Sequence, residues 1–274
     1  MEKNIVVIKN VTFGYDEDKP IIKNISLNIP QGKITAIMGG SGSGKTTLLR
    51  LMSGQYTADR GSVSVFDQNV GSLNNREILK LRRNLGMLFQ FGALFTDMSV
   101  YENVAFSLRE HTDLPQEIID KIVAMKLEAV GLFGTQNMMP QELSGGMARR
   151  IALARSIALD PELMLYDEPF TGLDPISLNV SAMLIKKLND ALGQTSVLVT
   201  HDIEASLKIV DYIYFMAGGE IVASGTPEEV QKTNNPIVRQ FIDGKVSGPF
   251  SFEYDTSLDY NTYIGLDSQS GNLS

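Results

Sequence analysis

The chain has 274 residues, of which 43% are hydrophobic, carries a formal net charge of −8 and contains no cysteine. This size suits one large domain or one domain with a small lobe, and the missing cysteine excludes disulfides, thiolate metal sites and a cysteine nucleophile. The acidic charge argues against broad nucleic-acid binding, so we expect no nucleic-acid partner.

The first thirty residues are predicted to form antiparallel strands. Residues 5–8, 11–13 and 25–29 are rich in apolar, β-branched side chains in an alternating pattern. A turn over 30–33 then leads into an apolar run at 34–38, which predicts a buried strand.

A glycine-rich run directly follows this strand and precedes an apolar helical segment at 47–52. It has the phosphate-loop spacing, in which a glycine is followed by four residues and then by Gly-Lys-[Ser/Thr]. Glycines let backbone N–H groups turn toward a polyphosphate, and the helix N-terminus adds free donors and partial positive charge. Lys45 can then reach the β- and γ-phosphates, and the Thr46 hydroxyl can ligate Mg²⁺. We expect a nucleotide-binding loop rather than a linker, formed by Gly39, Gly40, Ser41, Gly42, Ser43, Gly44, Lys45, Thr46 and Thr47.

The middle of the chain is predicted to be partly helical. We expect a strand pair over 61–66 and a buried strand over 85–89, and 100–130 have a helical pattern with a helix start at Pro115. Apolar residues follow the polar Gln90 closely. They form either a groove for a short helix of a membrane permease or part of the hydrophobic core. These residues are Phe91, Leu94, Phe95, Met98 and Val100.

The second half alternates helices and strands as a parallel α/β sheet does, with strands at 163–166, 196–200 and 212–216. Asp167 and Glu168 follow the first of these strands. A carboxylate there can hold Mg²⁺ next to the phosphate loop, which suits Asp167. Glu168 is then placed to orient or deprotonate an attacking water. The alternative for the pair is an ordinary charged strand end.

The chain has two histidines, and only one follows a predicted strand. His201 comes directly after 196–200, where it could bind the γ-phosphate and sense its loss. His111 lies in a polar stretch, and we expect it to be simply exposed.

A second glycine signal, Ser144-Gly145-Gly146, opens a helical pattern over 148–159. Serine is a good helix N-cap, and two glycines let a ligand approach the backbone closely. The sequence therefore predicts either a second anion site or a plain helix cap.

After about residue 245 the composition changes to Ser, Gly, Asn and Asp with several aromatics. Such a segment is either a disordered terminus or one that becomes ordered on a partner. We predict that residues 246–274 dock on a partner or on the neighbouring ATPase subunit and steady the assembly.

Together these motifs resemble those of the ATP-binding cassette (ABC) ATPases, in the family's order, over roughly residues 5–243. Residues 143–147 look like the signature motif, and Asp167-Glu168 like the Walker B end. Gln90 resembles the Q-loop glutamine and Asp174 the D-loop aspartate. His201 resembles the switch histidine, and Tyr15 the A-loop aromatic that stacks on adenine.

The resemblance implies an α/β fold of the P-loop NTPase class, of the ABC ATPase type. It comprises a RecA-like mixed, mainly parallel sheet, an antiparallel β subdomain and an α-helical subdomain. We predict an ABC ATPase domain over 1–245, with the helical subdomain at about 91–160, and a C-terminal extension over 246–274.

The resemblance also implies ATP and Mg²⁺ as cofactors. The metal would be held by Thr46, Gln90 and Asp167, and hydrolysis would depend on Glu168, His201 and Gln90. ATP would be clamped in a head-to-tail dimer, between the phosphate loop of one copy and the signature residues and Asp174 of the other. One position departs from the family pattern, because Met147 stands where glutamine is usual, and a thioether cannot replace the hydrogen bonds of an amide.

Residues 87–95 and 143–175 resemble more closely the ATPases that serve MCE-type lipid transporters. This implies three kinds of partner besides a second copy: a transmembrane permease, an MCE-domain protein and a STAS-domain protein. Because no stretch approaches the roughly 18 apolar residues of a membrane span, we expect the chain to be peripheral on the cytoplasmic face of an inner membrane, held by partners. The alternatives are the ATPase of another ABC importer or exporter, or a soluble ABC protein outside transport.

Overall fold

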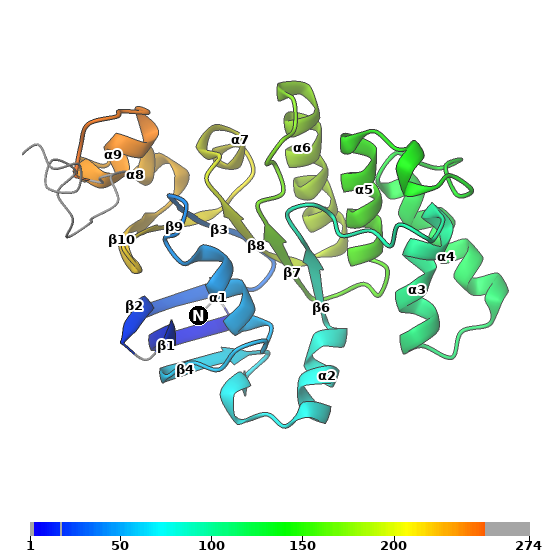
Figure 1. Cartoon of the computed structure of the whole chain (residues 1–274), viewed down its shortest axis with the longest axis horizontal. Coiled ribbons are helices and arrows are strands. Elements are labelled where there is room, and N and C mark those ends of the chain that lie inside the picture. The colour runs from blue at the N-terminus through cyan, green and yellow to red at the C-terminus, as the bar shows by residue number, and fades with distance from the viewer. Residues whose placement is uncertain (1–2, 17, 250–274) are drawn as a thin grey trace, which may run out of the picture.

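The computed structural model describes residues 3–16 and 18–249, in which two β-sheets lie beside a helical lobe (Figure 1). The smaller sheet is antiparallel with strand order β2-β1-β4-β5. The larger has the order β10-β9-β3-β8-β7-β6, and only its edge strand β10 runs antiparallel to its neighbour. The bounds are β1 (Asn4–Asp16), β2 (Lys19–Pro30), β3 (Ile34–Gly39), β4 (Arg60–Val65), β5 (Gln68–Asn69), β6 (Leu85–Leu88), β7 (Leu163–Asp167), β8 (Thr195–Thr200), β9 (Tyr212–Ala217) and β10 (Glu220–Gly225).

Two strand expectations change in the structure. Residues 61–66 hold one strand, β4, rather than a strand pair, and β4 pairs with β1 and β5. Residues 5–8 and 11–13 are parts of the single strand β1, not two separate strands. The pairing with β2 is irregular between Ile8 and Val11, where Asn10 has a φ of 49°. Asparagine tolerates this left-handed conformation, so the apparent gap in the sequence pattern is a bulge rather than a turn.

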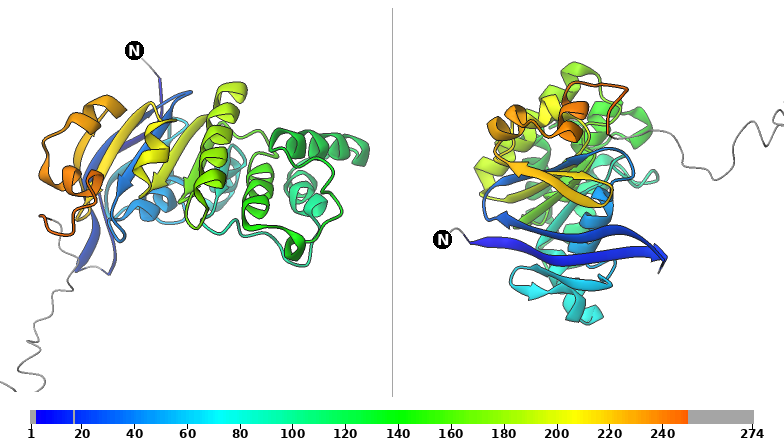
Figure 2. Two further views of the ribbon diagram at one scale, coloured as in Figure 1. Left: turned by 90° about the horizontal axis from the view of Figure 1, so that it is seen from above. Right: turned by 90° about the vertical axis from the view of Figure 1, so that its left-hand side faces the viewer.

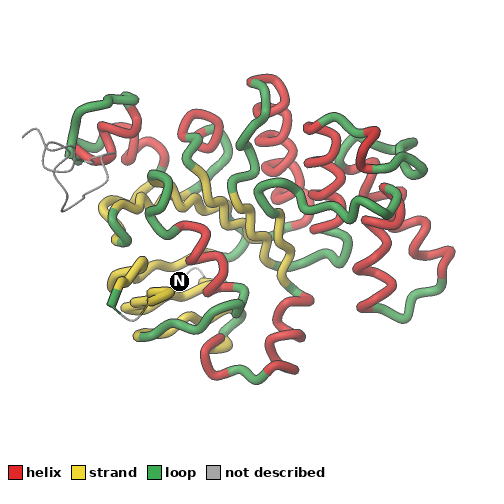
Figure 3. Tube along the Cα trace, viewed as in Figure 1, coloured by secondary structure: helices red, strands yellow, loops and turns green. Residues whose placement is uncertain are grey.

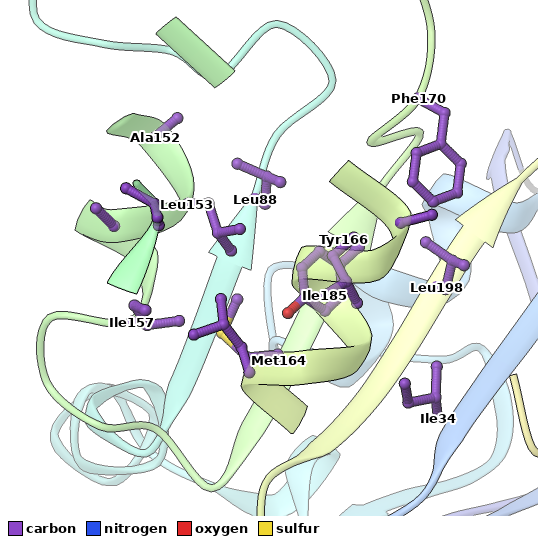
Figure 4. Packing of buried hydrophobic residues seen from close by; sticks show 14 of the residues in the cluster. Ile34, Leu88, Ala152, Leu153, Ile157, Met164, Tyr166, Phe170, Ile185 and Leu198 are labelled. Carbon is purple, nitrogen blue, oxygen red and sulfur yellow. The ribbon is translucent and has the colours of Figure 1, made fainter. Parts of the chain in front are cut away.

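The larger sheet is buried on both faces, and alternate residues of its strands enter two different cores. On β7, Met164 and Tyr166 face a core shared with the helices, whereas Leu163 and Leu165 face the small sheet. This alternation follows from the two-residue period of a strand. Figure 4 shows the helix-side core around Tyr166, and Figure 3 shows the strands crossing the middle of the molecule between helices.

The helices divide between the flanks of the large sheet and the lobe. In Figure 2, α3 and α4 lie away from the strands, and α5 packs between these two helices and β6, all within the range predicted for a helical subdomain. Helix α1 instead packs between the sheets, since Leu48, Leu49 and Leu51 are buried in the small-sheet core. The bounds are α1 (Lys45–Met52), α2 (Asn75–Arg83), α3 (Val100–His111), α4 (Gln116–Ala129), α5 (Gly145–Ser156), α6 (Pro175–Leu192), α7 (Ile203–Leu207), α8 (Pro227–Lys232) and α9 (Pro236–Ile242), with 3₁₀ turns η1 (Val70–Ser72) and η2 (Pro140–Glu142).

Local sequence signals explain where the lobe helices begin. The Ser99 side chain accepts the backbone N–H of Glu102, and the Glu102 side chain accepts the backbone N–H of Ser99. These two hydrogen bonds form a capping box at the start of α3. Helix α4 starts directly after Pro115, as the sequence predicts.

None of the helices described within residues 3–249 is long and apolar enough to cross a membrane. The prediction for the C-terminal extension concerns residues 246–274, and from residue 250 onward these lie outside the described part of the chain.

Candidate functional site

The phosphate loop joins β3 to α1 and contains two glycines that no other residue could replace without movement. Gly39 has a φ of +147°, and a Cβ atom there would lie 2.1 Å from the carbonyl oxygen of Met216. Gly44 has a φ of +98°, and its Cβ would lie 2.6 Å from the side chain of Ile22. The loop is therefore held between β9 and β2, which fixes where its backbone N–H groups lie.

Lys45 is buried at the start of α1, and its ammonium group turns back into the loop. Its Nζ donates to the carbonyl oxygens of Gly39 and Gly40, both at 2.9 Å, and lies 3.7 Å from Oε1 of Glu168. Burial lowers the pKa of Lys45, and the nearby Glu168 carboxylate partly offsets this effect. The only carboxylate within ion-pair distance of Lys45 in the described chain is thus the predicted catalytic one.

Thr46, in the first turn of α1, contacts Asp167, at the end of β7. The Thr46 hydroxyl donates to Oδ1 of Asp167 at 2.8 Å, and burial raises the pKa of the Asp167 carboxyl. A hydroxyl and a carboxylate are hard oxygen donors of the kind Mg²⁺ prefers, with waters and phosphates completing its coordination. These two residues therefore fit the predicted metal. No cluster of three or more His, Asp or Glu side chains suited to a metal occurs in the described ranges, and Mg²⁺ bound with nucleotide does not need one.

Glu168 holds a strained backbone conformation at the end of β7. Its φ is 49°, a value that a non-glycine residue rarely adopts. Its Oε2 lies 2.7 Å from Nδ1 of His201 and accepts the backbone N–H of His201 at 3.3 Å. The structure thus brings the two predicted catalytic residues into direct contact, although they are 33 positions apart in the sequence and follow two different strands, β7 and β8.

These groups open onto one cavity of 530 Å³. Tyr15 stands at one side, its ring set edge-on against Phe13 and Tyr56 and its hydroxyl 3.3 Å from Oγ1 of Thr47. Gln90 lies on the wall as well. The lining residues are Tyr15, Ile21, Ser41, Gly42, Gly44, Lys45, Thr46, Thr47, Gln90, Glu168 and His201.

The second glycine motif lies elsewhere. Ser144 caps α5, accepting the backbone N–H of Met147 at 3.3 Å, and neither it nor the glycines line the cavity. Asp174 caps α6 by accepting the N–H groups of Ile176 and Ser177, both at 3.0 Å. The two helix starts are neighbours, because a Cβ on Gly146 would lie 3.5 Å from Oγ of Ser177. Ser144, Gly145 and Asp174 are exposed.

Two contributors to the cavity were missed from the sequence. Ile21 lines it from β2, and no local signal marks that residue. Arg50 donates to the Tyr15 hydroxyl at 3.2 Å, and its place one helical turn after Thr46 could have indicated that it faces the loop.

The family model described as "ABC transporter" matches residues 22–171. The chain is also 52% identical over 254 residues to the intermembrane phospholipid transport system ATP-binding protein MlaF of Haemophilus influenzae, across 93% of this chain and 96% of that protein. The chain belongs to the ABC transporter family. It is an ATP-hydrolysing ABC ATPase, and the resemblance found in its motifs is confirmed.

Solved structures agree on the fold. cbiO1 from Clostridium perfringens, part of the ABC transporter complex cbiONQ, has a TM-score of 0.80 at 29% identity, over 89% of this chain and 96% of that one. The ATP-binding cassette MJ0796, solved as a dimer in a post-hydrolysis state with ADP and Pi, has a TM-score of 0.74 at 32% identity, over 81% of this chain and 98% of that one. The predicted α/β P-loop ABC ATPase fold is therefore confirmed.

Proposed function

We propose that this chain is the MlaF-type ATPase of a phospholipid-transport complex, in which ATP hydrolysis moves phospholipid between an inner and an outer membrane. The observation that carries the proposal is the extent of the match to the Haemophilus influenzae protein. More than half of the residues are identical, and the alignment runs through nearly the whole length of both chains. The similarity therefore includes much more than the nucleotide-binding motifs shared by all ABC ATPases.

Within this proposal the cavity holds ATP. Tyr15 stacks on the adenine, and the loop N–H groups and Lys45 bind the phosphates. Thr46, Asp167 and Gln90 hold Mg²⁺, which when bound neutralises charge on the phosphates. Glu168 orients and deprotonates the attacking water, while His201 contacts the γ-phosphate and steadies the Glu168 carboxylate through the 2.7 Å contact. Lys45 exchanges its present carbonyl and carboxylate partners for phosphate oxygens.

The second half of each site comes from another copy of the chain. Ser144, Gly145 and Gly146 do not line this chain's own cavity, yet they stand at the start of α5, where Ser144 and Gly145 are exposed and backbone N–H groups lack helical partners. A head-to-tail dimer would close them on the ATP of the partner. The dimeric form of MJ0796 supports this arrangement.

A groove next to Gln90 is the proposed contact with a transmembrane permease of the MlaE kind. It has a volume of 380 Å³, with Phe89, Phe95 and Phe106 among its apolar residues and Arg82 and Arg83 among its basic ones. Of the apolar residues predicted to form it, Phe95 does line the groove, whereas Val100 is fully buried in the core. The complex would also contain MlaD-like MCE and MlaB-like STAS proteins and lie on the cytoplasmic face of the inner membrane.

The proposal is tested by purifying the tagged full-length chain from its own membranes and identifying what accompanies it. We expect a permease, an MCE-domain protein and bound phospholipid, together with ATPase activity. Recovery of an active ATPase with a solute permease and no MCE-domain protein would overturn the phospholipid assignment and leave the ABC ATPase assignment intact.

A further inference from the structure

One arginine of α5 connects the two loops that carry Gln90 and Glu168. The Arg149 guanidinium donates through Nη2 to the carbonyl oxygen of Gln90 at 2.7 Å. Through Nη1 it donates to the carbonyl oxygens of Pro169 at 2.6 Å and Glu168 at 3.4 Å. The first carbonyl lies just beyond β6 and the other two just beyond β7, so Arg149 bridges neighbouring strand ends from the helix side.

The environment of Arg149 leaves these carbonyls as its chief partners. The side chain is partly buried, and burial lowers its pKa. Across residues 3–16 and 18–249, no carboxylate lies within ion-pair distance of it. The guanidinium is planar and presents several donors in a fixed fork, so it holds three acceptors in a set arrangement, whereas the three donors of a lysine ammonium rotate on a flexible stem and share one nitrogen.

The position of Arg149 in α5 connects the start of that helix to the backbones of Gln90 and Glu168. The same helix begins with Ser144, Gly145 and Gly146, the residues proposed to meet the nucleotide of a second copy. Because an α-helix is stiff over one turn, a shift of its first turn also moves Arg149. The guanidinium would carry that shift to the backbones of Gln90 and Glu168.

We propose that Arg149 is a positioning residue, which sets the backbones of Gln90 and Glu168 in their hydrolytic arrangement when the start of α5 engages the ATP of the partner copy. The inference rests on the roles proposed above for Gln90 and Glu168. It adds a side chain that does not line the cavity and that acts through three backbone carbonyls.

Arg150 provides a matched control on the same helix turn. Its Nη1 donates to a single carbonyl, that of Val130 at the end of α4, at 3.3 Å. It has the same charge and chemistry as Arg149, but within the described residues it donates no hydrogen bond to the carbonyls of the loops after β6 and β7. Arg155 is a poorer control, because it holds the carbonyls of Gly92 and Ala93 close to Gln90.

The test compares R149Q, R149K and R150Q in the full-length chain, purified with its native partner subunits. For R149Q we expect kcat to fall at least about tenfold while KM for ATP stays within about twofold, because an arrangement needed for hydrolysis is lost and nucleotide binding is not. R149K should lose less, because it keeps the charge but holds fewer carbonyls. R150Q should retain wild-type kcat and KM.

A double-substitution cycle separates positioning from general stability. The thermal midpoint of each variant is measured with and without ATP, and R149Q is combined with Q90A. If Arg149 acts through Gln90, R149Q should reduce kcat much less in the Q90A background than in the wild type. Additive losses, a full wild-type kcat in folded R149K or R149Q, or an equal loss in R150Q would each overturn the inference. A wild-type complex without ATPase activity would instead overturn the proposed function.

Discussion

The cavity and the Ser144–Asp174 surface, meaning Ser144, Gly145, Gly146 and Asp174, differ in how their polar groups are satisfied. In the cavity, Lys45, Thr46, Glu168 and His201 contact one another or the loop backbone, and most are held by residues distant in sequence. On the other surface, Ser144 and Asp174 cap their own helices. The first region is organised within a single chain, whereas the second is the one proposed to act on the nucleotide of another copy. The following predictions test that difference.

The largest effect is expected for Glu168→Gln, which keeps the side-chain shape but removes the base. We expect kcat to fall by about 10² to 10⁴, the range for loss of a general base, while ATP binding is retained. Steady-state ATPase assays and nucleotide-binding titrations on the same preparation would measure this. Full activity in the variant would remove Glu168 from its proposed role.

A large effect is also expected when the two regions are damaged in separate chains. Lys45→Ala should abolish phosphate binding by the loop. Gly146→Asp should place a carboxylate where the nucleotide of a partner is expected. Each variant alone should therefore be inactive. A mixed dimer has one site with an intact loop and an intact signature, so an equal mixture should recover up to about a quarter of wild-type ATPase activity. If the mixture stays inactive while mixed dimers form, the proposed head-to-tail sandwich is wrong.

A smaller effect is expected from the buried Asp167. Because burial raises its pKa, this carboxyl favours folding when protonated, and that contribution is lost as pH rises through the folded-state value. Asp167→Asn should therefore raise the metal-free melting temperature near neutral pH, by about 2 °C, while weakening Mg²⁺ binding. In the wild-type protein, Mg²⁺ affinity should fall as pH is lowered, since the metal requires the carboxylate.

These two readouts can be taken by calorimetry between pH 5 and pH 8, an interval that begins above the ordinary aspartate value of about 4. Thr46→Ser is the matched control, because it keeps the hydroxyl that contacts Asp167. A lower melting temperature in Asp167→Asn without metal would contradict the cost assigned to the buried charge.

The smallest effect is expected for Ser144→Ala on the stability of the unbound chain. Loss of an N-cap hydroxyl costs about 1 kcal/mol, so the melting temperature should fall by a few degrees at most. In the assembled complex the same change should reduce ATPase activity more than this stability loss explains. Comparison with Ser99→Ala, at the equivalent cap of α3, isolates the functional part.

The sequence predicts best what depends on local pattern. The phosphate loop, the strand before it and the helix after it follow from glycine spacing and apolar runs, and Pro115 correctly marks the start of α4. The pattern around Asn10 predicts two strands where the structure has a bulge within one strand, because alternation alone does not distinguish a bulge from a turn. Phe95 and Val100 are both apolar, and only packing puts one in a groove and the other in the core.

The contacts of Arg149 could not be predicted from the sequence. Its partners are backbone carbonyls of three other residues, and every residue has such a carbonyl, so no residue type marks them. The roles of the individual site residues stay predictions until the variants above are measured. The resemblance to ABC ATPases depends on six motifs in a fixed order rather than on any one of them.

The backbone angle at Glu168 has a consequence for how this protein would respond to selection for thermostability. An L-residue in the left-handed region costs roughly 1–2 kcal/mol, and glycine adopts it without that penalty. Glu168→Gly would thus relieve local strain and at the same time delete the carboxylate proposed to activate water. The same change would leave the buried Lys45 without its carboxylate partner, so the relief of backbone strain is set against a lost ion pair, and stability and activity must be assessed together at this position.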